Sequence, residues 1–269
     1  MKMNSKLARL AMGVVVLGCT TTWQNCLAQT DDPLALVKEL YGYSEWEGQT
    51  KEHYEQIVTN WVPDLGSMGI TNFDVVDDRE ELTNFIPQKF TWIYLYPPDA
   101  PAAQVRLLIH ECLDVTNAEF ALLFELSQTS APFAVYTLGS VIGLDLGDRC
   151  YVPSIGGVSE RAFLVRNNVC LSFQSYRYSV LRLAEKLDCE LLVRSFSGPV
   201  LLQPGITQGA FHANVPTVPG KIYFLESSGS PAGTNWLSYT RVLVGDGTIG
   251  IVTRPAFSPG EEYFRLRVE

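Results

Sequence analysis

The sequence is poor in the side chains that most catalytic and metal sites use. Only three histidines occur in 269 residues, and none of the cysteines forms a CxxC pair. Zinc sites draw on closely spaced histidine and cysteine, so the chain offers little for one. The serine hydrolase pattern G-x-S-x-G is also missing, because 139–143 and 229–233 both fall one position short of it. We therefore expect no metal and no cofactor.

Basic charge is scarce as well. The chain has 20 Lys and Arg against 29 Asp and Glu, a net charge of −9. Residues 1–28 hold three of the basic residues and no acid, so the remainder carries 17 − 29 = −12. A field of that sign repels nucleic acid and anionic membrane surfaces. We expect no nucleic-acid partner.

The longest apolar run lies near the N-terminus and is too short to span a bilayer. Residues 1–28 have the basic start, short apolar centre and small-residue end of a signal peptide. A second interpretation stays open, since Val16 to Cys19 resembles a bacterial lipobox that would place a lipid on Cys19 and anchor the chain to the outer membrane. Both interpretations predict export to the periplasm, the cell surface or the medium.

Beyond residue 28 the cysteines number four, at positions Cys112, Cys150, Cys170 and Cys189. An even number in an exported chain favours disulfides, and these four allow three pairings. All four are disulfide candidates.

Composition divides the mature chain in two. Residues 31–198 hold the four cysteines and 24 acidic against 12 basic residues, while 199–269 hold five of each charge and many turn signals. We place the boundary in the small-residue stretch near residue 196. The expected domains are 29–196 and 197–269.

For the first region we predict an α+β fold, in which helices pack on a mainly antiparallel sheet. Apolar periodicity and flanking proline predict helices over 33–41, 51–61, 118–126 (with a capping box at Thr116 and Glu119) and from a Ser179 cap to about 192. β-Branched and aromatic runs predict strands over 90–96, 105–112, 149–153, 161–166 and 169–173. The acidic residues at 77–78 and 80–81 predict a solvent-exposed turn rather than a metal site.

The second region reads as a small all-β sandwich. Phe211, Ala213 and Val215 alternate with polar residues, as do Phe264 and Leu266. Five to seven short strands are expected within these 70 or so residues.

A family resemblance supports this interpretation. The stretch from Gly220 to Ser228, followed by Trp236 and the closing strand from Tyr263 to Val268, resembles small β-sandwich modules appended to bacterial exported proteins. Here Tyr263 and Phe264 stand in the reverse of the usual aromatic order. The resemblance implies an accessory or surface-attachment role. Residues 85–195 resemble uncharacterised exported α+β domains, to which no activity attaches.

The dipeptide Asn167-Asn168 separates two apolar runs and predicts a two-residue hairpin turn. That register places Val165 opposite Cys170. Pairing of the preceding strand through the glycines at 156–157 places Cys150 near Phe163, on the face of Cys170 but two strands away. Such a separation is too long for a disulfide, so Cys150–Cys170 is excluded. Cys189 falls on the polar side of its helix.

Two candidate sites remain open. His110 and Cys112 share one face of a strand, where an imidazole and a thiol could form the nucleophile of a hydrolase-like enzyme. The simpler alternative is that they are polar residues near the end of a strand, with no role in catalysis. Trp236 and Tyr239 would suit a sugar-stacking platform, although aromatics at strand ends commonly fill cores. Asp145 and Asp148 provide too few oxygen ligands for a calcium site.

No catalytic constellation is complete, so a non-enzymatic role is favoured while enzymatic activity stays undecided. The leading hypothesis is an exported binding or cell-surface accessory protein, with a surface glycan or a protein as its partner. The alternatives are a hydrolase-like enzyme using His110 and Cys112, and carbohydrate binding by the sandwich. Ligand, oligomeric state and disulfide pattern are not determined by the sequence.

Overall fold

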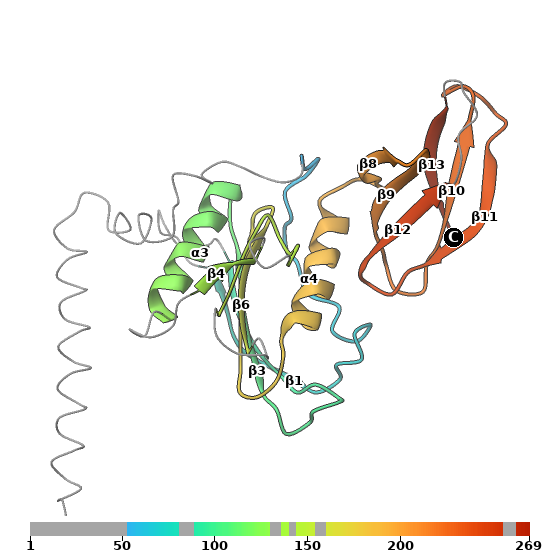
Figure 1. The fold of residues 1–269 in the computed structure, drawn as a ribbon. Coiled ribbons are helices and arrows are strands. Elements are labelled where there is room, and N and C mark those ends of the chain that lie inside the picture. Colours follow the sequence, from blue (N-terminus) through green and yellow to red (C-terminus); the bar gives the residue numbers. More distant parts are fainter. Residues whose placement is uncertain (1–52, 81–88, 130–135, 140–143, 154–159, 255–261) are drawn as a thin grey trace, which may run out of the picture. The chain divides into compact units, whose positions relative to one another are not determined.

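The computed structural model describes residues 53–269 except 81–88, 130–135, 140–143, 154–159 and 255–261 (Figure 1). The described residues belong to one compact unit, Gly48–Glu269. Within them every strand pairing is antiparallel and two helices are present, so the fold is β-rich. Neither of these helices is long and apolar enough to cross a membrane.

One sheet holds seven strands in the order β1-β2-β3-β7-β6-β5-β4. The strands are β1 (Phe73–Glu80), β2 (Lys89–Leu95), β3 (Val105–Glu111), β4 (Tyr136–Leu138), β5 (Arg149–Pro153), β6 (Arg161–Arg166) and β7 (Val169–Ser175). Two meanders therefore meet at the central pair of β3 and β7. The solvated turn predicted at 77–81 is wrong, because Asp77 and Asp78 lie in β1 and pair with β2. Tertiary pairing overrides the low strand propensity of aspartate.

The two helices cover opposite faces of this sheet (Figure 1). Leu164, Leu171 and Ile109 form one cross-strand row, which is buried against Leu187 and its neighbours on α4 (Leu181–Arg194). The adjacent row runs from Val165 through Cys170 to His110 and faces α3 (Val115–Thr129), because the His110 ring contacts Glu125 of that helix. The apolar stripe predicted for the second helix is confirmed by its buried leucines.

Both predicted helix caps are wrong by one or two residues. The first helix begins after Asp114, whose carboxylate oxygen accepts the Asn117 amide, and Thr116 lies inside the helix. The second helix begins after Val180, which makes no side-chain cap bond, so Ser179 is not its cap. Asp114 provides the same kind of acceptor two residues earlier than Thr116 would.

The predicted hairpin register is confirmed, with Arg166 opposite Val169 and Val165 opposite Cys170. The neighbouring register is one residue away from the prediction, because Cys150 pairs with Leu164 rather than lying beside Phe163. A one-residue shift moves every side chain to the other face. Cys150 and Cys170 are therefore on opposite faces of the sheet.

The four predicted disulfide cysteines are all buried, and none of them forms a disulfide bond in the described part of the chain. Cys150 and Cys170 are separated by the sheet, as their pairings show. Cys189 lies on the side of α4 away from the sheet, as expected, and its thiol approaches the carbonyl oxygen of Thr217 at 3.6 Å. The exclusion of a Cys150–Cys170 bond is consistent with the structure, although the predicted reason was wrong.

The C-terminal strands form two three-stranded sheets, β12-β9-β8 and β11-β10-β13. The strands are β8 (Leu202–Thr207), β9 (Ala210–Pro216), β10 (Ile222–Ser228), β11 (Leu237–Val244), β12 (Ile249–Arg254) and β13 (Tyr263–Val268). Their inner faces share one apolar cluster, in which the rings of Phe211 and Phe264 stack with centroids 4.0 Å apart. A side chain at Gly250 would collide with Leu243, so the facing sheets approach closely there.

The helix predicted over 51–61 is wrong where the structure describes it, because residues 53–61 are neither helix nor strand. Val58 and Trp61 of this segment are nevertheless buried, at 3% and 2% exposure, and belong to the main hydrophobic cluster. The predicted helix at 33–41 and the loop at 156–157 lie outside the described residues.

Candidate functional site

The hairpin turn between β6 and β7 is the centre of a buried polar cluster. Asn167, the first central residue of the two-residue turn, adopts a positive φ of 54°, whereas Asn168 does not, so the turn is not of type I′. Neither turn asparagine is exposed to solvent, and Arg166 is 4% exposed. Hairpin turns are usually at the surface, so the neighbours that cover this one need explanation.

Arg166 is held by a carboxylate from α4. Its Nε and Nη2 atoms donate to the two oxygens of Asp188 at 2.7 and 2.8 Å, and the Gly147 amide donates to the same carboxylate at 3.0 Å. Burial alone would lower the pKa of Arg166, but Asp188 outweighs it and holds that pKa well above its usual value. The guanidinium is therefore a permanent charge inside the protein.

Asp148 closes the other side of the cluster. It accepts the Tyr54 hydroxyl at 2.5 Å and the Asn167 amide at 2.8 Å, and Arg166 Nη1 lies 3.4 Å away. Burial raises the pKa of Asp148, and it also raises the pKa of Tyr54. The loop that the sequence offered as a weak calcium candidate therefore contributes one of its aspartates to this internal network.

The turn asparagines bind the main chain of residues 54–65, which we call the strap. Asn168 accepts the Val58 amide at 2.9 Å and donates to the Val58 carbonyl at 2.8 Å and to the Cys112 carbonyl at 2.7 Å. Asn167 donates to the Gln56 carbonyl at 2.8 Å and to the Ser195 hydroxyl at 3.0 Å. The hairpin turn therefore binds a segment of the chain that is neither helix nor strand.

Two glutamates hold the second half of the strap. Glu111 accepts the amides of Asn60 and Trp61 at 2.8 and 2.9 Å. Glu190 accepts the Trp61 indole N–H at 2.9 Å and the Asp64 amide at 3.1 Å. We call the residues that bind the strap the strap contacts, and they are Glu111, Asn167, Asn168, Glu190 and Ser195.

The predicted reactive strand is arranged for structure rather than for nucleophilic attack. His110 Nε2 lies 3.2 Å from Glu125, and the ring packs edge-on against Phe90. The Cys112 thiol approaches the His110 carbonyl oxygen at 3.7 Å rather than the ring. Burial raises the pKa of Cys112, so its reactive thiolate is disfavoured. His110 and Cys112 share a neighbourhood but do not form a nucleophile–base pair.

A second polar group lies on the outer face of the β11-β10-β13 sheet. Glu226 accepts bonds from Arg265 and Arg267 at 2.8 Å each, and from the Ser238 hydroxyl at 2.8 Å. Hydrogen bonds from Arg267 first, then Ser238 and Arg265, lower the pKa of Glu226 to about 2. The arginine side chains are 48% and 38% exposed.

Each of these arginines also lies over an aromatic ring. Arg265 lies 4.3 Å from the Trp236 ring centroid, and Arg267 lies 4.1 Å from that of Phe224. Exposed apolar side chains from the same face surround them, among them Val242 and Val244 at 40% and 64% exposure. We call this surface the arginine face; it comprises Ile222, Phe224, Glu226, Trp236, Ser238, Val242, Val244, Arg265 and Arg267.

Trp236 is thus half-buried, with one ring face covered by Arg265 and its indole N–H donated to the Gly233 carbonyl at 2.8 Å. Tyr239 lies in the neighbouring strand β11, and its side chain is outside the described part of the structure. The sequence predicted a binding surface around Trp236 but did not include Arg265 and Arg267 in it. These arginines were interpreted only as the polar residues of a strand that alternates apolar and polar side chains.

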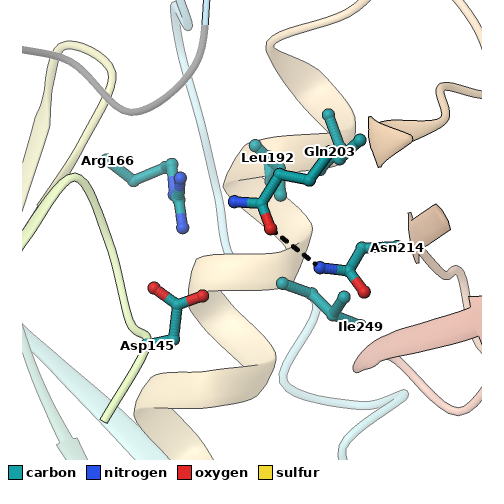
Figure 2. Close-up of a pocket in the computed structure, with 7 residues that line it drawn as sticks. Asp145, Arg166, Leu192, Gln203, Asn214 and Ile249 are labelled. Atoms are coloured by element: carbon teal, nitrogen blue, oxygen red, sulfur yellow. Dashed lines mark hydrogen bonds between the residues drawn. The ribbon is translucent and has the colours of Figure 1, made fainter. Parts of the chain in front are cut away.

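A small hollow lies beside the polar cluster. Figure 2 shows Asp145 and Arg166 on one side of it and the hydrogen-bonded pair Gln203 and Asn214, 3.2 Å apart, on the other. The hollow measures about 20 Å³. That is room for one or two water molecules, at roughly 10–15 Å³ each. An organic ligand does not fit there.

Within the described ranges, no three His, Cys, Asp or Glu side chains gather closely enough to hold a metal ion. No protein-family model matches the chain, and neither curated proteins nor solved structures include a significant match to it.

Sequence reasoning missed most of the strap contacts. Neither Glu111 nor Glu190 was predicted to bind residues 60–64. The available signal was the pair of asparagines, since two adjacent amides between apolar strands offer four polar groups that need partners.

Proposed function

We propose that the protein is an exported, non-enzymatic binding or cell-surface accessory protein. In this proposal residues 29–196 form an α+β domain, residues 197–269 form a small β-sandwich domain, and residues 1–28 direct export. Either cleavage near Gln29 or lipidation of Cys19 would deliver such a chain outside the cytoplasm. The arginine face is the contact surface.

The observation that carries the proposal is the pairing of charge and aromatic surface on that face. Arginine and aromatic residues are enriched at protein interaction surfaces, where a rigid ring supports a planar donor. Glu226 holds Arg265 and Arg267 in place through their Nε atoms. A surface organised in advance loses less conformational entropy on binding.

The hydrolase-like alternative has weaker support. Its two residues would need an imidazole against a thiol, and His110 instead contacts Glu125 while Cys112 is buried with a raised pKa. Carbohydrate binding at the arginine face is a narrower form of the binding proposal. Its ring platform is reduced because Arg265 covers one face of Trp236.

The test compares the mature chain with an Arg265→Ala/Arg267→Ala variant in co-sedimentation with bacterial cell-envelope fragments. We expect the variant to lose at least tenfold in the fraction retained, because both stacked guanidiniums are removed. The charge-matched control is Arg177→Ala/Arg182→Ala, which changes two exposed arginines elsewhere. If all three proteins are folded by circular dichroism and are retained equally, the proposal is contradicted.

A glycan array separates the two partner classes. If the partner is a surface glycan, the mature chain binds specific glycans, and Trp236→Ala weakens that binding. If the array is blank while envelope retention persists, the partner is a protein. Binding that is unchanged by Trp236→Ala counts against the sugar platform.

A further inference from the structure

We propose that the open edge of β13 is a binding site for an extended strand of a partner protein, in which apolar and acidic residues alternate. The added strand would extend the β11-β10-β13 sheet by one member, a mode in which main-chain bonds give affinity and alternate side chains give specificity. The inference rests on the proposed function, because Arg265 and Arg267 of the arginine face lie on this strand, and it names the partner as a protein segment.

β13 has a partner strand on one side only. It pairs with β10 over its whole length, and no described strand lies on its other side. The β10–β13 register has no irregularity, whereas the edge strands β1, β8 and β11 are each interrupted by a shift in register. An irregular edge resists the addition of another strand, while a regular edge is a template for one. β13 is therefore suited to accept a strand.

The backbone groups of Leu266 and Val268 point to this open edge. Ile222 and Glu269 exchange both of their backbone hydrogen bonds, at 2.9 Å each, which fixes the alternation along β10 and β13. In an antiparallel pair every second residue bonds across to the partner strand, so Arg267 bonds to β10. Its neighbours Leu266 and Val268 therefore direct their N–H and C=O groups away from β10, where an added strand would meet them.

The sandwich core is incompletely covered at the same edge. Leu266 and Val268 pack against the core on the inner face and are only partly buried. Their cross-strand neighbours on β10, Leu225 and Tyr223, are 2% and 3% exposed. Apolar residues of an added strand would cover the remaining surface of Leu266 and Val268, and removal of apolar surface from water is favourable.

The outer face determines the charge of the partner. Arg265 and Arg267 alternate with the apolar pair, so they lie opposite the intervening positions of an added strand. Those positions form non-hydrogen-bonded pairs, in which Cα atoms are about 4.5 Å apart and side chains are close. Arg265 donates to Glu226 through its Nε, and neither of its Nη atoms has an acceptor among the described residues. Carboxylates at these positions would pair with guanidiniums that Glu226 already holds in place.

A second copy of β13 fits this edge less well than an acidic strand. In the antiparallel arrangement centred on Leu266, Arg265 of each chain would lie opposite Arg267 of the other chain. Like charges directly opposite each other destabilise a strand pair. Charge complementarity therefore favours a partner with acidic residues over self-association.

The experiment measures binding of a short fluorescent peptide, in which valine and glutamate alternate, to the full chain by fluorescence anisotropy at neutral pH. A peptide with lysine in place of glutamate is the charge control. We expect the glutamate peptide to bind at least tenfold more tightly than the lysine peptide, and Arg265→Gln/Arg267→Gln to remove this preference. Equal binding of the two peptides by the wild-type chain, or an unchanged preference in the variant, overturns the proposal.

A change at the edge separates strand addition from binding at the arginine face alone. Val268→Pro removes an outward N–H but no bond to β10, which is the kind of position where proline is tolerated in a sheet. Val268→Ala shortens the same side chain and keeps the N–H. We expect Val268→Pro to bind the glutamate peptide at least tenfold more weakly than Val268→Ala does. Equal binding by the two folded variants contradicts strand addition.

Hydrogen exchange followed by NMR is a second measurement, and it needs no variant. In the free protein the amide of Leu266 should exchange faster than that of Arg267, which bonds to β10. Saturation with the glutamate peptide should slow exchange at Leu266 and Val268 at least tenfold. If the peptide binds and neither amide is slowed, it binds elsewhere and the proposal is wrong.

Co-sedimentation with envelope fragments shows which of the two proposals fails. If Arg265→Ala/Arg267→Ala loses retention while Val268→Pro keeps it, the arginine face binds its partner without strand addition, and only the inference about the edge is overturned. If the peptide binds as expected but the arginine variant is retained as well as wild type, the edge site stands and the proposed envelope partner is contradicted.

Discussion

The protein places arginine against carboxylate in two settings, and the contrast between them separates architecture from recognition. In the hairpin cluster the Arg166 and Asp188 side chains are 5% and 1% exposed and form two parallel bonds. On the arginine face Glu226 is equally covered, but its arginines are about half exposed. The first arrangement faces inward to other parts of the chain, and the second faces solvent.

The difference follows from desolvation. A charge removed from water is tolerated only when its partner and its remaining hydrogen bonds are all in place, so a buried pair specifies one geometry. An exposed pair is screened by water and contributes little to folding. The following predictions test this contrast, beginning with the largest effect.

Asp188→Ala should lower the free energy of unfolding by about 3–5 kcal/mol, because it leaves the Arg166 guanidinium buried without its partner. The same change also removes the acceptor of the Gly147 amide. Urea denaturation followed by circular dichroism measures the loss. The double variant Arg166→Met/Asp188→Leu should lose less than the single variant, and a single-variant loss below about 1 kcal/mol would contradict the argument.

Asn168→Ala should cost about 2–3 kcal/mol, since buried carbonyl and amide groups of Val58 and Cys112 lose their partner. The matched control is Asn214→Ala, an asparagine whose only described side-chain bond is to Gln203 near the surface. That control should change stability by less than about 0.5 kcal/mol. Equal effects of the two variants in urea denaturation would show that the side-chain bonds of Asn168 contribute nothing specific to the free energy of unfolding.

Acidification should affect the arginine face through Glu226. The pKa of this carboxyl is about 2 in the folded protein and about 4.3 in an unfolded chain. Because the folded value is lower, the stabilisation is fully present above the unfolded pKa and is lost as the pH falls toward the folded one. Solvent screening at the half-exposed arginines limits it to roughly 1 kcal/mol.

The measurement is the difference in unfolding free energy between wild type and Glu226→Gln at several pH values. We expect the gap to be present at pH 6 and to shrink between about pH 4 and pH 2. A gap that does not change with pH would mean that the charge of Glu226 has no role in stability.

Of the substitutions in the two arginine settings, Arg265→Ala should have the smallest effect on stability, about 0.5–1 kcal/mol, because one exposed ion pair and one cation–π contact are lost. Thermal unfolding by differential scanning calorimetry can detect a change of this size. An effect as large as that of Asp188→Ala would remove the distinction between the two arginine settings.

Local signals predicted the central elements of the fold. The apolar runs at β6 and β7 and the two asparagines between them were sufficient for the hairpin and its register. Alternation in β9 and the leucine stripe of α4 identified their buried faces. These features depend on side-chain periodicity, which a single sequence displays directly.

Features that depend on distant neighbours were missed. A helix was predicted over 51–61, whereas Asn168 and Glu111, which lie 110 and 50 residues away along the chain, are among the residues that bind its main chain. The acidic strand β1 owes its conformation to pairing with β2. The one-residue error beside β5 arose because its connecting loop does not specify the register.

The sequence by itself determined the scarcity of catalytic side chains, the acidic balance, the division in composition and the hairpin register, because all of these are properties of composition or of neighbouring residues. Tertiary structure alone decided that the hairpin turn is buried, that His110 contacts Glu125 and that none of the four described cysteines forms a disulfide bond. The physical reason is that a polar side chain has no assigned partner until the chain folds. Burial then makes the choice of partner costly to change.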